Sequence, residues 1–283
     1  MQHSLRSLLL ALQFFTRIPL PSPVEKWVGF APERMREAMG YMPAIGWLVG
    51  MVASLVYAGV LELWGTPLML RASPTLLALL AALLSTAATI WLTGGMHEDG
   101  LADVADALGG YASSERALQI MKDSRVGNYA VLTLGMALVL KMGLLAALAL
   151  LQTRTLFCVL VTAHVVSRFF PLLLVNWLPH VALEGQSKTR QVAGVIGGIR
   201  LWSAALWCLP LAAVYWLPRG GALLLLLVGS CTVIAGLVAM LMGWWFHRRL
   251  KGFTGDCLGA TQQACELACY ATALTVMLQV IAV

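Results

Sequence analysis

Long apolar runs constrain this chain more than any other feature. A helix needs about 20 residues to cross the hydrocarbon core of a bilayer, and seven runs approach or exceed that length: residues 41–63, 74–92, 129–151, 155–178, 201–217, 221–243 and 258–283. Only 11% of the residues are charged, against roughly 25% in soluble domains. We therefore predict an all-α, polytopic integral membrane protein with about seven transmembrane helices. The shorter apolar run 4–15 is expected to form an interfacial helix.

This composition excludes an ordinary soluble enzyme and a nucleic-acid-binding module. We see no repeat, low-complexity tract or soluble domain, so residues 1–283 form one membrane domain. The six cysteines form no CxxC pair and lie mostly in apolar runs. They are expected to be small core residues, not a disulfide framework or a zinc site.

The basic residues predict which loops share a side of the membrane. Most of the 19 lysines and arginines lie in the N-terminal segment and in loops around 94–128, 179–200 and 244–257. The loops between these carry one basic residue each. Because cytoplasmic loops are enriched in lysine and arginine, we predict that the N-terminus and these three loops face the cytoplasm. The net charge of +6 is therefore explained by basic residues in cytoplasmic loops and does not indicate an acidic partner.

Acidic residues gather after the second apolar run. Six of the 13 lie between positions 98 and 123, and Asp99, Asp103 and Asp106 are spaced four and three apart. That spacing places three carboxylates on one helix face. Their repulsion near a membrane favours a compensating divalent cation, and Mg²⁺ is usually shared between carboxylates and substrate phosphates. The alternative is a helix whose acids only face water.

A compact polar string follows at residues 122–127. Lys122 and Arg125 are suited to phosphate, and Arg125 can make a bidentate contact. Asp123 can serve as a further metal ligand or as a base for a substrate hydroxyl. Ser113 or Ser114 is expected to cap a short helix that runs to about Lys122. The alternative is a juxtamembrane anchor of basic residues.

Polar residues also occur inside later apolar runs, where they are expensive and usually functional. Arg168 either reaches a polar cavity or snorkels from the end of its span, and Lys141 has the same two options. Thr254 and Asp256 stand where the last span begins, and helix starts bind phosphate. Three further polar residues lie within that span: Gln262, Gln263 and Glu266.

Three motifs together resemble the cobalamin synthase family. They are GGMHEDGLADVAD at 94–106, IMKDSRVG at 120–127 and TGDCLGA at 254–260, and FTRIPLP at 15–21 adds support. The resemblance covers essentially the whole chain, in order. It implies a Mg²⁺-dependent phosphotransferase of the bacterial cytoplasmic (inner) membrane, at the end of cobalamin biosynthesis. Such enzymes join adenosylcobinamide-GDP to α-ribazole or its 5′-phosphate, giving adenosylcobalamin or its 5′-phosphate and GMP.

The resemblance turns the motif residues into a hypothesis of roles. Asp99, Asp103 and Asp106 are expected to hold one or two Mg²⁺ ions on the pyrophosphate. His97 or Asp123 is expected to accept the proton of the ribazole 3′-hydroxyl, and the sequence does not choose between them. The residues expected to bind substrate are Lys122, Ser124, Arg125, Arg168, Thr254 and Asp256.

Two other functions stay open at this point. One is a CDP-alcohol-type lipid phosphotransferase, although the acid spacing departs from that family's motif. The other is a cation-coupled transporter, which should place its acids near the bilayer midplane in repeated halves. The expected partners are the two small-molecule substrates and membrane lipid, with no nucleic acid. Small polytopic enzymes often self-associate, so a homo-oligomer is left open.

Overall fold

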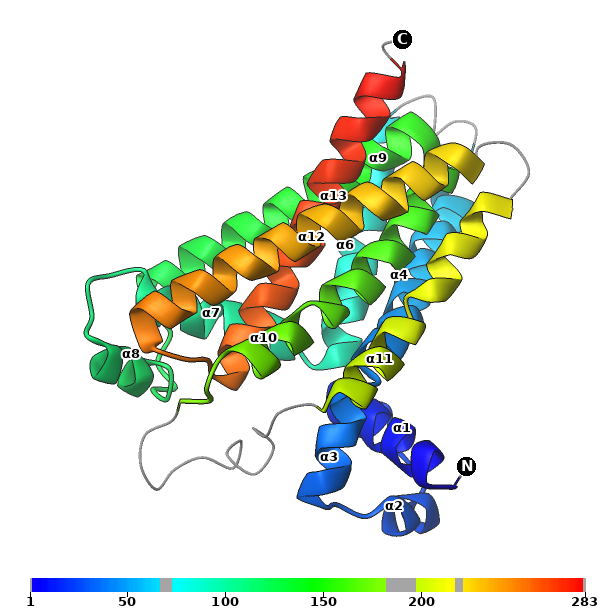
Figure 1. Cartoon of the computed structure of the whole chain (residues 1–283). Coiled ribbons are helices and arrows are strands. Elements are labelled where there is room, and N and C mark those ends of the chain that lie inside the picture. The colour runs from blue at the N-terminus through cyan, green and yellow to red at the C-terminus, as the bar shows by residue number, and fades with distance from the viewer. Residues whose placement is uncertain (1, 67–72, 182–196, 217–220, 282–283) are drawn as a thin grey trace.

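Helices joined by short turns make up nearly all of the computed structural model, which describes residues 2–66, 73–181, 197–216 and 221–281 (Figure 1). Within these ranges the only β-type pairing is one isolated bridge between His180 and Phe253. The elements are α1 (Gln2–Phe15), α2 (Ser22–Val28), α3 (Pro32–Met39), α4 (Met42–Trp64), α6 (Pro74–Thr93), α7 (Met96–Leu108), α8 (Ser114–Ile120), α9 (Asn128–Phe169), α10 (Pro171–Trp177), α11 (Gly198–Leu206), the 3-10 helix η2 (Leu209–Trp216), α12 (Gly221–Leu250) and α13 (Gly255–Ile281).

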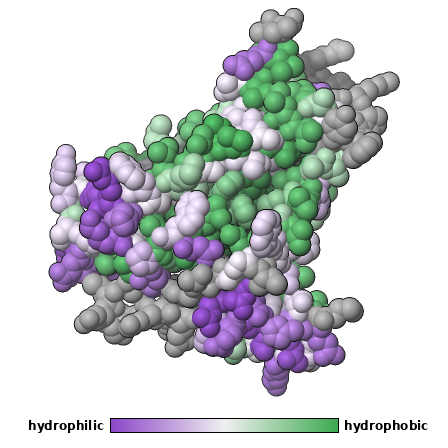
Figure 2. Space-filling view, viewed as in Figure 1, coloured by the Kyte–Doolittle hydropathy of each residue, from purple (hydrophilic) through white to green (hydrophobic). Residues whose placement is uncertain are grey.

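Five helical stretches in the described ranges are long and apolar enough to cross a membrane. They are Met42–Trp64, Pro74–Thr93, Asn128–Trp177, Gly221–Leu250 and Gly255–Ile281. Apolar residues cover the elongated body of the molecule, and hydrophilic ones gather around α1–α3 and α8 (Figure 2). The prediction of an all-α polytopic membrane protein is confirmed.

The 50-residue stretch Asn128–Trp177 is a hairpin. A straight helix of that length would measure about 75 Å, more than twice the hydrocarbon thickness. The backbone at Gln152 leaves the helical region, with φ −163° and ψ 104°. Lys141 and His164 lie on either side of Gln152, yet each approaches Glu266, at 2.6 and 3.4 Å. We call residues 128–151 the first arm and 153–169 the second arm of α9. The first arm matches the predicted span 129–151, and the predicted span 155–178 is divided between the second arm and α10.

The predicted span 201–217 is not one continuous helix. The structure has α11, a turn at Trp207–Cys208 and then η2. Pro210 lacks a backbone N–H, and its ring clashes with the carbonyl four residues earlier in an α-helix. The α-helix therefore ends before Pro210, and two shorter elements replace the helix expected there.

Helix α13 lies at the centre of the molecule. It packs against both arms of α9 and against α7, α10 and α12. Thiols help to join α12 to α13: Cys231 Sγ donates to the Cys269 carbonyl at 3.4 Å, and Cys265 Sγ donates to the Ala235 carbonyl at 3.3 Å. All six cysteines are free; four of them are buried, as expected of small core residues, whereas Cys158 and Cys208 are half-buried.

The two ends of the molecule differ. Helices α1–α3, α7 and α8 lie at one end, and the C-terminal end of α13 lies at the other (Figure 1). The first end is the one that carries the N-terminal segment and the loop around 94–128. This grouping follows the alternation predicted from the basic residues, whereas the cytoplasmic orientation of that end stays a prediction. Residues 182–196 of the predicted 179–200 loop, including Lys188 and Arg190, lie outside the described residues.

Glycines on α4 give a test of this packing. A Cβ at Gly46 would lie 2.4 Å from the His164 carbonyl oxygen, whereas a Cβ at Gly59 would meet nothing within 4 Å. We expect Gly46→Ala to lower the free energy of unfolding by about 1–3 kcal/mol through overpacking. Gly59→Ala should be neutral or stabilising by up to about 1 kcal/mol, because alanine favours a helix. Thermal unfolding in detergent, followed by tryptophan fluorescence, measures both; equal shifts would contradict the close contact of α4 with α9.

Candidate functional site

A double-glycine turn positions the acidic helix α7. Gly94 and Gly95 both have φ of +71°, in the left-handed region that favours glycine. The turn ends α6 and starts α7 within two residues. The N-terminal segment is fixed to the same corner, because the backbone N–H of Arg17 donates to the Leu92 carbonyl at 2.7 Å. Arg17 also covers Gly94, where a Cβ would lie 2.8 Å from its Nε.

The three aspartates share one face of α7, as predicted. Asp99 is exposed, and Asp103 and Asp106 are half-buried. His97 and Glu98, in contrast, are 4% and 8% exposed. Helix α7 thus presents carboxylates on one face and buries polar side chains on another.

A fourth carboxylate, Asp256, joins this face from the first turn of α13. The two helices approach closely because both have glycine at the crossing. A Cβ at Gly100 would lie 2.8 Å from the Asp256 carbonyl oxygen, and one at Gly259 would lie 3.3 Å from the His97 Cα. Thr254 holds Asp256 in place: its hydroxyl accepts from the Cys257 N–H and donates to Asp256 Oδ2, both at 3.3 Å.

Asp103 lies at the centre of this acidic group. Burial, followed by the negative charges of Asp256 and Asp99, raises the pKa of Asp103 to about 7, and Lys122 acts in the opposite direction. The structure thus brings Asp256 and Lys122, which the sequence had assigned to substrate, close to Asp99 and Asp103 of the predicted metal set. Carboxylates crowded in this way are stabilised by a cation.

Asp106 has a different local role. Its carboxylate accepts the backbone N–H groups of Gly127 at 2.6 Å and of Ala130 at 2.8 Å, at the start of α9. These are donors that a helix start leaves without a partner, and negative charge is favourable there. Gly127 leaves room for this approach, because a Cβ there would lie 2.6 Å from Asp106 Oδ1 and the carboxylate would have to shift. A role of Asp106 as a metal ligand stays a prediction.

The donor set fits Mg²⁺ in its chemistry. Among the described residues, no three His, Cys, Asp or Glu side chains are arranged to hold a metal ion on their own. Mg²⁺ is usually held by one or two carboxylates, with water and substrate phosphates completing the octahedron. Crowded carboxylate oxygens near Asp103 therefore suit an ion shared with a phosphate substrate, not a closed protein site.

Exposed cations lie on the loop that follows α8. Ser113 caps α8 by accepting the Arg116 N–H at 3.3 Å, as predicted. Lys122, Ser124 and Arg125 are exposed. Arg125 pairs with Asp123 at 2.5 Å, and its hydrogen bonds lower the pKa of Asp123 to about 2. Asp123 is therefore a weak base as long as this pair is intact.

Two predicted site residues lie in the interior. Burial, followed by the charge of Arg168, lowers the pKa of His97 to about 3. Arg168 is 3% exposed, and its guanidinium contacts His164 Nδ1 at 3.1 Å and the His164 carbonyl at 3.0 Å. The structure does not place either residue on the exposed acidic face. Their roles in base catalysis and substrate binding stay predictions.

A buried polar network surrounds Glu266. Its carboxylate contacts Lys141 Nζ at 2.6 Å, Gln262 Nε2 at 2.7 Å and the Tyr270 hydroxyl at 3.1 Å. His164 Nδ1 lies 3.4 Å away. Glu266 is 1% exposed and Lys141 3%. One carboxylate therefore joins α13 to both arms of α9.

The network continues to α7. Gln262 donates to Ser167 at 2.9 Å, and Gln263 donates to Gln262 at 3.0 Å and to Glu98 at 3.0 Å. The sequence had marked Lys141, Gln262, Gln263 and Glu266 as expensive in a membrane. It did not show that they are partners or that Glu98 belongs with them. Charges buried in a membrane need partners, and that rule is the signal that could have paired Lys141 with Glu266.

Comparison with known proteins bears on this arrangement. A family model described as cobalamin-5-phosphate synthase matches residues 7–274. The chain belongs to the cobalamin-5-phosphate synthase family. It is a transferase of late cobalamin biosynthesis, and the predicted family and enzyme class are confirmed.

Named relatives agree over nearly the full length. An adenosylcobinamide-GDP ribazoletransferase of Polaromonas sp. strain JS666 is 46% identical, over 94% of this chain and 95% of the relative. The proteins with the same name from Albidiferax ferrireducens and Shewanella piezotolerans are 43% and 36% identical, over 95% and 97% of this chain and 98% and 97% of their own. No solved structure matches.

The roles of Asp106 and Asp99 can be distinguished by experiment. Asp106→Ala removes the cap of α9, so we expect the free energy of unfolding to fall by about 0.5–2 kcal/mol. Asp99→Ala removes no such contact from the described residues and should leave thermal unfolding in detergent nearly unchanged while lowering turnover. Unchanged stability in Asp106→Ala would contradict the capping role.

The buried pair gives a second prediction. Removing one partner of a buried ion pair costs about 3–5 kcal/mol, so Glu266→Gln and Lys141→Met should each lower the midpoint of thermal unfolding strongly. The double variant should lose less than the sum of the two, because neither charge is then left alone. Glu62→Gln, at an exposed acid of α4, is the matched control. Additive losses would show that Lys141 and Glu266 do not stabilise each other.

Proposed function

We propose that this chain is an adenosylcobinamide-GDP ribazoletransferase. It transfers the cobinamide-phosphate group of adenosylcobinamide-GDP to α-ribazole or its 5′-phosphate and releases GMP. The observation that carries the proposal is the acidic group of Asp99, Asp103 and Asp256, with Lys122 beside it. The names of the full-length relatives supply the substrates.

This arrangement suits the reaction. Phosphoryl transfer needs little covalent chemistry from the protein and depends on positioning and on neutralising charge. We place a Mg²⁺ ion at Asp99 and Asp103, with Asp256 beside them; when bound, it neutralises the pyrophosphate oxygens as a Lewis acid. The 3′-hydroxyl oxygen of ribazole attacks the phosphorus nearer the cobinamide, and the bond from that phosphorus to the GMP oxygen breaks.

The chain's own residues have distinct tasks in this proposal. Lys122 and Arg125 bind phosphate oxygens, for which an exposed guanidinium is well shaped. Asp106 fixes the start of α9, and Thr254 orients Asp256. Of the two predicted bases, Asp123 lies on the exposed loop with Lys122 and Arg125, whereas His97 is buried. A phosphate that binds Arg125 would free Asp123 to accept the hydroxyl proton.

We further propose that the end of the molecule with α1–α3, α7 and α8 faces the cytoplasm of a bacterial inner membrane. The nucleotide substrate is soluble in water, and most basic loops belong to this end. The other candidate functions fit less well. Repeated halves typical of transporters are not visible in the sequence, and the relatives are named for a corrinoid, not for a lipid alcohol.

Asp103→Ala tests the proposal. We expect turnover to fall by at least about 10²–10³-fold, the usual cost of removing a main electrostatic contact, while expression and thermal unfolding stay close to those of the parent. The assay supplies adenosylcobinamide-GDP and α-ribazole to protein in nanodiscs, with and without Mg²⁺, and follows GMP and the new corrinoid. Glu115→Gln, an exposed acid on α8, is the control.

Turnover near the parental rate in Asp103→Ala would refute the assignment of the site. No product from the folded parent protein, with an active relative as control, would refute the substrate assignment. CDP-activated lipids and ion flux would then be tested, because they separate the other two functions.

A further inference from the structure

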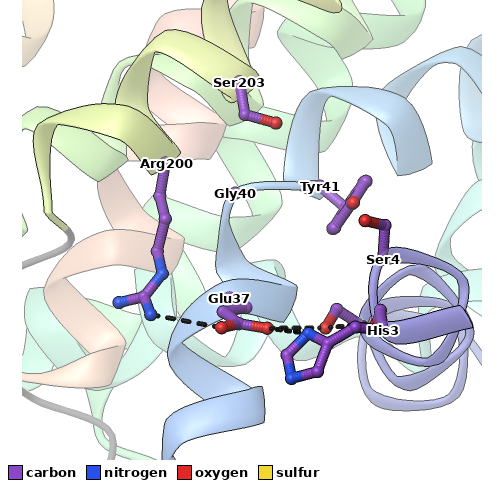
Figure 3. Close-up of a pocket in the computed structure, with 8 residues that line it drawn as sticks. His3, Ser4, Glu37, Gly40, Tyr41, Arg200 and Ser203 are labelled. Carbon is purple, nitrogen blue, oxygen red and sulfur yellow. Dashed lines mark hydrogen bonds and ion pairs between the residues drawn. The ribbon is translucent and has the colours of Figure 1, made fainter. Parts of the chain in front are cut away.

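A polar hollow lies apart from the residues proposed for the reaction. Its volume is about 280 Å³, and its walls come from α1, the α3–α4 corner and α11 (Figure 3). Since one water occupies about 30 Å³ of liquid, the hollow has room for several waters or for one small polar group.

Opposite charges meet in this hollow. Glu37 is held between two basic side chains: Arg200 lies 3.3 Å from its Oε1, and His3 Nδ1 lies 3.1 Å from its Oε2. Ser7 also donates to Oε2 at 2.9 Å. Figure 3 shows Arg200 and His3 approaching Glu37 from opposite sides. A ligand in the hollow therefore meets a carboxylate and a guanidinium side by side.

The surroundings of the hollow are those of a membrane boundary. Ser4 and Ser203 line it, and their chain neighbours Leu5 and Trp202 are 49% and 75% exposed. Leu206, one turn after Trp202 on α11, is 61% exposed. Tryptophan is enriched where hydrocarbon meets headgroups. The hydrophilic N-terminal helices meet the apolar body here (Figure 2), and from these features we infer that the hollow lies at headgroup depth.

We propose that this hollow binds the headgroup of a phospholipid that carries both a phosphate and a primary ammonium. Glu37 accepts hydrogen bonds from the ammonium, and Arg200 donates to the phosphate, for which its planar fork is suited. The acyl chains lie along Trp202 and Leu206.

The charges select this lipid class. An anionic lipid without an ammonium brings a second negative charge beside Glu37, so Arg200 must then be shared between the lipid phosphate and the carboxylate. A choline headgroup has no N–H to donate to the carboxylate. Free phosphate makes no use of the exposed apolar residues. Phosphatidylethanolamine offers an ammonium to Glu37, a phosphate to Arg200 and acyl chains to the exposed apolar residues.

Lipid retention by the full chain tests the proposal. Delipidated protein in detergent is titrated with phosphatidylethanolamine, phosphatidylcholine or phosphatidylglycerol of matched acyl chains, and bound lipid is counted by native mass spectrometry. We expect phosphatidylethanolamine to bind at least about tenfold more tightly than the other two, a difference of about 1.4 kcal/mol. Glu37→Gln and Arg200→Gln should each abolish the preference.

Matched variants keep the test specific. Glu33→Gln changes the same charge on the same helix, at a side chain that is 71% exposed and pairs with Arg36 at 3.5 Å, and should retain the preference. Ser203→Leu fills the hollow without removing a charge and should abolish it, which covers the case in which the Glu37 variant does not fold. Equal binding of phosphatidylglycerol, equal binding of phosphatidylcholine, binding of inorganic phosphate as tight as that of phosphatidylethanolamine, or equal loss in Glu33→Gln would each overturn the proposal. Turnover is not the readout, so the result is independent of the substrate assignment.

Discussion

The ion pair between Lys141 and Glu266 is the contact on which the rest of the structure depends. Both side chains are almost fully buried within apolar helices and lie 2.6 Å apart. An unpaired charge at such a position is costly, so Lys141 is stabilised where the first arm of α9 lies beside α13. His164 brings the second arm to the same carboxylate. The reversal at Gln152 is therefore matched by a polar contact deep in the bundle as well as by apolar packing.

This buried network also sets the position of the acidic helix. Helix α7 has 13 residues, too few to cross a bilayer, and its place is determined by what it packs against. Glu98 accepts a hydrogen bond from Gln263, which also donates one to Gln262, and Gln262 donates to Glu266. Glycines at the crossing bring the first turn of α13 close enough for Asp256 to influence Asp103. The inner face of α7 is fixed in the bundle, and the outer face presents carboxylates.

Local patterns predicted most of the fold, and contacts between distant residues account for what they missed. Hydropathy located the spans because the requirement for a transmembrane helix, about 20 consecutive apolar residues, is met within each segment. The spacing of Asp99, Asp103 and Asp106 predicted a shared face for the same reason. Helical rotation places His97 about 150° from the centre of that face, so its burial was open to prediction. Asp256 joins the acidic face of α7, and Asp106 caps α9, only because of how α13 and α9 pack against α7. A local sequence pattern carries no information about that packing. Pro210 was a visible signal against one helix over 201–217.

Crowded carboxylates are unfavourable by themselves, and the structure explains how the chain holds them. Burial and three neighbouring acids raise the pKa of Asp103 to about 7, so repulsion opposes this arrangement. A loop would relax and separate the charges. Here α7 is held on its other side by buried hydrogen bonds, and Asp256 is held by Thr254 and by the start of a long membrane helix. The membrane bundle therefore keeps the acids together in spite of their repulsion. A site organised in advance spends less of its interaction energy on rearrangement when charge develops, which gives a physical reason for building the proposed transfer site on a membrane scaffold.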